Sequence, residues 1–228
     1  MTLRELRSAR LRKGWTQTEA AARMGMTQAY LNFLENGKRR LTPELVRRAT
    51  SVYRLSPETL PVTDTFTPQN VNDQRLTEWL AQLEYPGFWY LRSRSLKRNP
   101  SEVLLTALAQ KSLDGRVAQA LPWVAMKYAH PNAWLVENAR KFNLQNRLGF
   151  VVRLARRVAE MRSDVARSAE LTQLENMLYD SRLAREDVFY RAPRTKGERE
   201  WLQTHQTDDA AHWNLLTDMR VEHLKYAS

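Results

Sequence analysis

Two capped helical segments separated by glycine restrict the fold of this chain more than any other sequence feature. Residues 16–37 read TQTEAAARMGMTQAYLNFLENG. Thr16 and Glu19 have the spacing of a capping box, in which the Thr hydroxyl accepts a backbone N–H and the Glu side chain reaches back to the cap. Gly25 suits the left-handed conformation that ends a helix. The stretch therefore predicts two short helices joined by a tight turn.

The segments on either side predict a small all-α domain around this pair. Thr27 is placed to cap the second helix, and Leu31 and Leu34 fall on one face at the spacing of a buried stripe. An apolar stripe over residues 3–11 precedes the pair. After it, Pro43 occupies a first helical position, where its missing N–H costs nothing, and residues 56–58 begin a short fifth helix. Two of these helices joined by a Gly-containing turn would form a helix-turn-helix unit.

Residues 3–60 resemble the Cro/cI (XRE) family of helix-turn-helix DNA-binding domains. The whole pattern matches in order, and the residues that carry it are Arg10, Thr16-Gln17, Ala21, Gly25, Thr27-Gln28, Leu31, Leu34-Glu35, Gly37 and Pro43. The resemblance implies a five-helix domain whose third helix enters the major groove with its N-terminal residues. It also implies an ion pair between Arg10 and Glu35 across the base of the domain.

The resemblance assigns two sets of DNA contacts. The side-chain oxygen and nitrogen of a Gln can both hydrogen-bond to adenine. Phe33 stands where the family commonly has a polar residue. It could contact thymine methyl groups, pack on the sugar edge or form a dimer contact. The basic loop after Gly37 would anchor the backbone, or would be a solvated turn. The implied base-reading residues are Thr27, Gln28, Ala29, Asn32 and Phe33, and the implied phosphate contacts are Thr16, Gln17, Lys38, Arg39 and Arg40.

The charge distribution agrees with a nucleic-acid partner for the first quarter of the chain. The protein has 36 Lys and Arg against 25 Asp and Glu, a net charge of +11. Residues 1–60 hold 12 basic and 5 acidic residues, whereas residues 61–228 hold 24 and 20. The excess is therefore concentrated where phosphates are expected, which is the electrostatic pattern of a nucleic-acid-binding domain. The alternative is a basic solvated surface with no partner.

Composition excludes several other classes of protein. The 228 residues include no cysteine, so disulfides, thiolate zinc sites and thiol nucleophiles are ruled out. No apolar run approaches the ~20 residues of a membrane span, and the N-terminus lacks an apolar signal core. The four histidines match no metal motif, and His205 and His212 are expected to be ordinary helix residues. We therefore expect a cytoplasmic bacterial protein, at the nucleoid when DNA-bound, that is not an enzyme and needs no cofactor or metal.

The rest of the chain is expected to form a linker over 61–74 and a second helical domain over 75–228, after the DNA-binding domain at 1–60. Asp114 is a candidate start for a helix that Pro122 interrupts. Residues 86–94, PGFWYLRSR, are the exception to helical spacing and could be extended or a loop. Three consecutive aromatics cannot all face one core, so this stretch is either a folded-back loop or a partner surface.

Two further groups of side chains in the second domain call for an interpretation. Five tryptophans at helical spacing are expected in the core: Trp79, Trp123, Trp134, Trp201 and Trp213. Four arginines are expected to form a basic helix face: Arg147, Arg153, Arg156 and Arg157. That face would be solvated and paired with Glu160, or would contact phosphates, or would dock an acidic partner.

The second domain more weakly resembles the C-terminal region of XRE regulators encoded beside toxin genes, whose neighbours are often AbiEii-type nucleotidyltransferases. EYPGFWYL, LQNRLGFVVRLAR, SRLARED and AAHWNLLTDM carry this resemblance. The sequence thus predicts a homodimeric repressor on a palindromic operator, the antitoxin and autoregulator of a toxin–antitoxin operon, with a cognate toxin as partner. The alternatives are a regulator whose second domain senses a small molecule, and a helical catalytic domain fused to a DNA-binding one.

Overall fold

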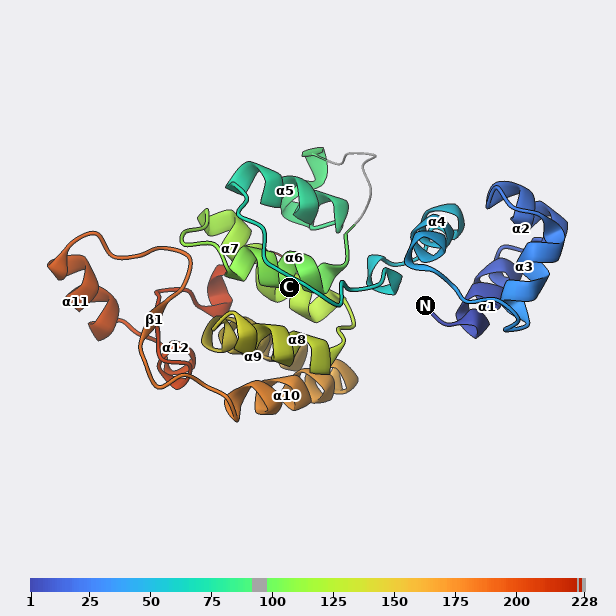
Figure 1. Ribbon diagram of the computed structural model, residues 1–228. Coiled ribbons are helices and arrows are strands. Elements are labelled where there is room, and N and C mark those ends of the chain that lie inside the picture. Colours follow the sequence, from blue (N-terminus) through green and yellow to red (C-terminus); the bar gives the residue numbers. More distant parts are fainter. Residues whose placement is uncertain (92–97, 225, 227–228) are drawn as a thin grey trace. The chain divides into compact units, whose positions relative to one another are not determined.

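A computed structural model of the chain describes residues 1–91, 98–224 and 226, and it is mainly helical, as the sequence predicts (Figure 1). Contacts divide the chain into two compact units, Met1–Asp64 and Thr65–Ser228. The segment expected to be a linker, 61–74, spans this division. Phe66 is buried in the core of the second unit, with its ring against Trp134, and α5 (Asp73–Gln82) begins before residue 75.

The first unit consists of α1 (Leu3–Arg12), α2 (Gln17–Arg23), α3 (Gln28–Glu35), α4 (Pro43–Tyr53) and a single 3-10 turn, η1 (Pro57–Thr59). Each of the four α-helices begins at a threonine whose hydroxyl accepts a backbone N–H: Thr2, Thr16, Thr27 and Thr42. The capping box of Thr16 and Glu19 is present. Gly25 follows α2 with φ of +60°, the left-handed conformation expected after a helix.

The core of the first unit is built from one face of each α-helix. Its buried side chains are Leu6, Ala9, Ala20, Ala21, Met24, Leu31, Leu34, Ala49 and Tyr53. The alanines of α2 let α3 approach closely, and α2 and α3 pack against each other. Because this core uses only residues of the first unit, the packing of α3 against α1 and α2 involves no side chain from the rest of the chain's core.

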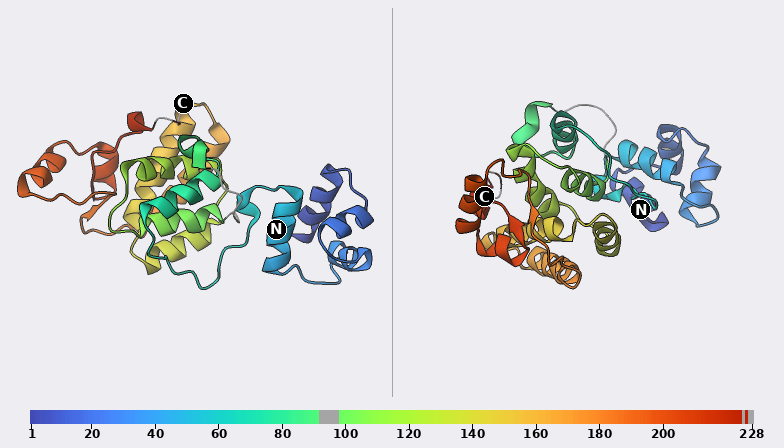
Figure 2. Two further views of the ribbon diagram at one scale, coloured as in Figure 1. Left: turned by 90° about the horizontal axis from the view of Figure 1, so that it is seen from above. Right: turned by 60° about the vertical axis from the view of Figure 1, so that its left-hand side comes forward.

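The second unit is a helical bundle around α9 (Gln145–Met161), which packs against most of its other helices (Figure 1). The other helices of this unit are α5, α6 (Pro100–Leu108), α7 (Gly115–Lys127), α8 (Asn132–Lys141), α10 (Val165–Tyr179), α11 (Lys196–Thr204) and α12 (Asp208–His212), with 3-10 segments η2 (Pro86–Leu91) and η3 (Val221–His223). Figures 1 and 2 show α11 set apart from the bundle. Pro122 lies inside α7, so the expected interruption of this helix is wrong.

Three features of the second unit differ from the sequence expectations. A short parallel pair joins β1 (Asp187–Val188) to β2 (Leu215–Leu216), which strand-like alternation did not indicate. The aromatic stretch forms the 3-10 segment η2, which the sequence did not predict, and residues 92–94 lie outside the described residues. Trp201 is 49% exposed and stacks on His205, so the expectation that it belongs to the core is wrong.

Candidate nucleic-acid interface

Helix α3 has a buried face and a solvent-exposed face. Leu31 and Leu34 are fully buried against the rest of the first unit. Gln28 and Ala29, at the start of the helix, are exposed, and so is Phe33. The Thr27 hydroxyl accepts the N–H of Tyr30 at 3.2 Å, which sets the start of the helix. The exposed face thus carries the side chains that the resemblance assigns to base reading, with Asn32 partly buried at its edge.

The amide of Gln17 connects α2 to α3 through three hydrogen bonds. Its Nε2 donates to Glu35 Oε2 at 3.0 Å and to Asn32 Oδ1 at 3.3 Å. Its Oε1 accepts from Nε2 of Gln28 at 2.8 Å. Both hydrogens of this side-chain amide are therefore used inside the domain, and they connect Gln17 to α3.

Asn36 extends the same set of bonds, and the sequence did not point to it. Its Nδ2 donates to Asn32 Oδ1 at 2.7 Å and to the Asn32 carbonyl oxygen at 2.9 Å. The i,i+4 spacing of the two asparagines on a helix was the available signal. Asn32 therefore has its side-chain oxygen occupied by two donors.

Arg10 and Glu35 form a nearly buried ion pair behind this network. Arg10 Nε lies 2.7 Å from Glu35 Oε1 and Nη2 lies 2.9 Å from Oε2, a two-pronged contact. The side chains are 9% and 2% exposed, and Arg10 Nη1 also donates to the Trp15 carbonyl at 2.8 Å. Burial by itself would raise the pKa of Glu35, but the hydrogen bonds from Arg10 and Gln17 outweigh it and hold this pKa below its usual range.

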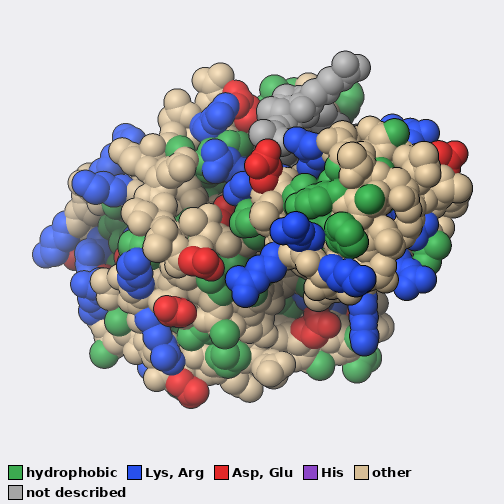
Figure 3. All heavy atoms as spheres, turned by 45° about the vertical axis from the view of Figure 1, so that its right-hand side comes forward, with side chains coloured by type: hydrophobic (Ala, Val, Ile, Leu, Met, Phe, Trp, Pro, Cys, Tyr) green, Lys and Arg blue, Asp and Glu red, His purple; other side chains and the backbone are tan. Residues whose placement is uncertain are grey.

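The basic side chains expected at phosphates are exposed on the first unit. Lys38, Arg39 and Arg40 follow Gly37 in the loop between α3 and α4, and all three are open to solvent. In contrast, the Thr16 hydroxyl is committed to its capping box, where it accepts from the Glu19 N–H and donates to Glu19 Oε2. Figure 3 shows one face of the molecule, on which Lys and Arg side chains predominate over Asp and Glu.

Residues 6–60 match the family model described as Helix-turn-helix. The match supports an XRE-type helix-turn-helix in the first unit. Domains of this family are DNA-binding modules without enzymatic activity, and the match supports a DNA-binding transcriptional regulator. The matched residues make up about a quarter of the chain. A search of the curated proteins and a search of the solved structures each returned no match.

The arginine-rich face of α9, outside the helix-turn-helix domain, is occupied by acidic side chains of the same unit. Arg147 forms a two-pronged pair with Asp187 at 2.8 and 2.9 Å. Glu175 of α10 accepts from Arg153 and Arg156, and Asp209 of α12 accepts from Arg153 and Arg157. The expected contact between Arg156 and Glu160 is present as well. These four arginines therefore connect α9 to its neighbours, which does not favour a phosphate or partner contact for most of this face.

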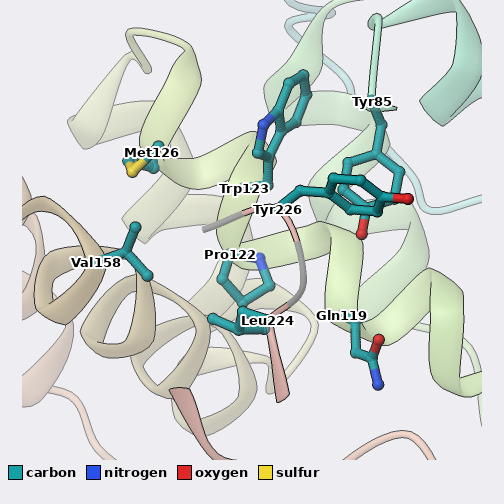
Figure 4. A pocket seen from close by; sticks show the side chains of 8 residues that line it. All are labelled: Tyr85, Gln119, Pro122, Trp123, Met126, Val158, Leu224 and Tyr226. Atoms are coloured by element: carbon teal, nitrogen blue, oxygen red, sulfur yellow. The ribbon is translucent and has the colours of Figure 1, made fainter. Parts of the chain in front are cut away.

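An apolar cavity in the second unit is too small for a metabolite. It is lined by Tyr85, Gln119, Pro122, Trp123, Met126, Val158, Leu224 and Tyr226 (Figure 4), and its volume is about 10 Å³. That is the space of one water molecule. The ring of Tyr226 packs edge-on against Tyr85, with the centroids 5.4 Å apart. A more open and more polar hollow of about 430 Å³ lies between residues 68–73 and 109–112.

The described residues contain neither a metal-ligand group nor a membrane-spanning helix. Among the described residues, no group of three or more His, Cys, Asp and Glu side chains is placed to hold a metal ion. The helices described there are all too short or too polar to cross a bilayer. His212 stacks on Tyr179 and His205 on Trp201, which gives both histidines a packing role.

In the aromatic stretch, Phe88 is buried, whereas Trp89 and Tyr90 are exposed.

Proposed function

We propose that the protein is a sequence-specific DNA-binding repressor whose α3 reads base edges in the major groove. The observation that carries this proposal is the exposed face of α3, on which the amide of Gln28 is held in place by α2 while Leu31 and Leu34 bury the opposite face. A side chain fixed before binding loses less conformational entropy when it contacts a base. Lys38, Arg39 and Arg40 supply the phosphate contacts that fix the register of the domain on the duplex.

A selection experiment tests the base-reading assignment. The full-length protein is incubated with a random library of 20-bp duplexes, and the bound fraction is amplified and sequenced until a preferred sequence emerges. Gln28→Ala should lower discrimination at one base pair by roughly 1–3 kcal/mol. Arg39→Ala should weaken all sequences alike and reduce the slope of log affinity against log salt by about one unit. Unchanged base preferences in Gln28→Ala would contradict the assignment.

We further propose that the protein acts as a homodimer on a palindromic operator, because one half-site offers few base contacts. The second unit is the proposed dimerisation and partner-binding part, with residues 1–60 as the DNA-binding part. Sedimentation of the full chain, with and without selected duplex, tests the stoichiometry. A monomer at tens of micromolar that also binds DNA as a monomer would contradict this part of the proposal.

The partner that we propose is a cognate toxin, which would make the protein an autoregulatory antitoxin in the bacterial cytoplasm. Only the resemblance of the second unit supports this step. Co-purification of the native operon's products, followed by binding of the complex to its own promoter, tests it. A ligand-responsive regulator is the alternative. The open hollow of about 430 Å³ between residues 68–73 and 109–112 is its candidate site, since the apolar cavity of about 10 Å³ holds no more than a water molecule.

A further inference from the structure

The hydrogen bonds behind α3 fix which atom of each amide faces outward. An ionised carboxylate only accepts hydrogen bonds, so the Gln17 atom that lies 3.0 Å from Glu35 Oε2 is the nitrogen. The depressed pKa of Glu35 keeps this carboxyl ionised at neutral pH. The side-chain oxygen of Gln17 therefore faces Gln28, and the Nε2 of Gln28 donates a hydrogen bond to it at 2.8 Å.

The same carboxylate sets the orientation of the second amide. The other hydrogen of Gln17 Nε2 points to Asn32 at 3.3 Å, where only an oxygen accepts it, and Asn36 Nδ2 donates to that oxygen at 2.7 Å. Within the residues that the structure describes, no further bond is made by Gln28 Oε1 or by Asn32 Nδ2. The face of α3 thus offers one free carbonyl oxygen at Gln28 and one free NH₂ group at Asn32.

We infer that Glu35 is a remote specificity determinant, which fixes the donor and acceptor pattern of Gln28 and Asn32 through Gln17. The inference rests on the proposed function. Gln28 keeps an oxygen and one N–H, which match the amino group and N7 of adenine. Asn32, with its oxygen occupied twice, offers only donors, so it favours the acceptors of guanine (O6, N7) or thymine (O4) and loses the two-pronged contact to adenine.

Replacing Glu35 by a neutral residue removes the charge that fixes the orientation of these side-chain amides. In Glu35→Gln the side chain at position 35 can accept or donate, so Gln17 can turn over and Gln28 and Asn32 can turn with it. Gln17→Met reaches the same end by another route, because it leaves the Arg10–Glu35 pair intact and removes the connecting amide. Glu19→Gln is the matched control, since it makes the same change in a capping box of the same domain, where Gln also serves.

The test is selection from the random 20-bp duplex library with the full-length wild type and these three variants. Selections with Gln28→Ala and Asn32→Ala first assign the base pair that each residue reads. We expect Glu35→Gln and Gln17→Met to lose about tenfold discrimination at those two base pairs, with preferences elsewhere unchanged. Glu19→Gln should keep the wild-type preferences throughout.

The outcomes separate this inference from the proposed function. A wild-type motif that both Glu35→Gln and Gln17→Met retain would overturn the inference and leave base reading by α3 in place. An equal weakening at every position would show a structural role for Glu35 and would also overturn it. If Glu35→Gln fails to fold, Gln17→Met decides alone. The absence of any motif for the wild type would refute the proposed function, and the inference with it.

Discussion

The buried ion pair between Arg10 and Glu35 should contribute more to the free energy of unfolding than an exposed ion pair does. The perturbation is a double-mutant cycle of Arg10→Met, Glu35→Leu and the double variant. The side chains are 9% and 2% exposed and meet through two bonds of 2.7 and 2.9 Å. Each single change removes a charge whose partner stays buried, whereas the double change removes both charges.

The expected magnitude follows from this burial. Breaking one side of a buried pair costs about 3–5 kcal/mol, and the residual bond from Arg10 to the Trp15 carbonyl places Glu35→Leu near the lower end. For a domain of this size, 1 kcal/mol shifts the melting temperature by about 4–8 °C, so about 3 kcal/mol corresponds to roughly 12–24 °C. The double variant should lose at least about 2 kcal/mol less than the sum of the single changes.

Residues 1–64 provide the assay, because their core is separate from that of the second unit and Trp15 is their single tryptophan. The Trp15 ring lies 5.5 Å from that of Tyr53, so its fluorescence should follow unfolding. The pKa of Glu35 is lower in the folded state than its unfolded value of about 4.3. The stabilisation is thus complete above that unfolded value and is lost as the pH falls through the lower folded one.

Acid titration therefore gives a second readout of the same pair. As the pH falls below about 4, the wild-type fragment should lose stability that the double variant lacks from the start. Additive effects in the cycle, each below about half a kcal/mol, would show an exposed pair of the usual small value and would refute the reasoning. Equal acid sensitivity in the wild type and the double variant would do the same.

Further predictions concern the second unit. Gly149→Ala should destabilise the second unit by about 1–3 kcal/mol in a urea titration, because the added Cβ would lie 2.3 Å from the ring of Trp213. Gly115→Ala is the control and should have little effect in the same titration, because its Cβ would meet no atom within 4 Å. Asp209→Ala should cost roughly 1.5–3 kcal/mol, since it removes the acceptor for two arginines of α9. The neighbouring Asp208→Ala is exposed and should cost less; equal losses for these two aspartates would show that the arginine contacts add little.

Local chemistry could be predicted from the sequence because it acts over three or four residues. The cap at Thr16, the helix ends at Gly25 and Gly37, and the apolar faces of α3 and α4 are all set by neighbours along the chain. The pairing of Arg10 with Glu35 spans 25 residues and was accessible only through the family resemblance.

Contacts between distant segments were decided by tertiary packing. Arg153 meets Asp209 across 56 residues, and the exposed arginine face that periodicity suggests becomes a set of bridges once α10 and α12 pack beside α9. Pro122 was expected to interrupt a helix, yet it is buried inside the continuous helix α7. Which amide atom faces outward on α3 was likewise beyond the sequence. Residue types and spacing set where Gln28 and Asn32 lie, but only the position of the Glu35 carboxylate beside Gln17 fixes their donors and acceptors.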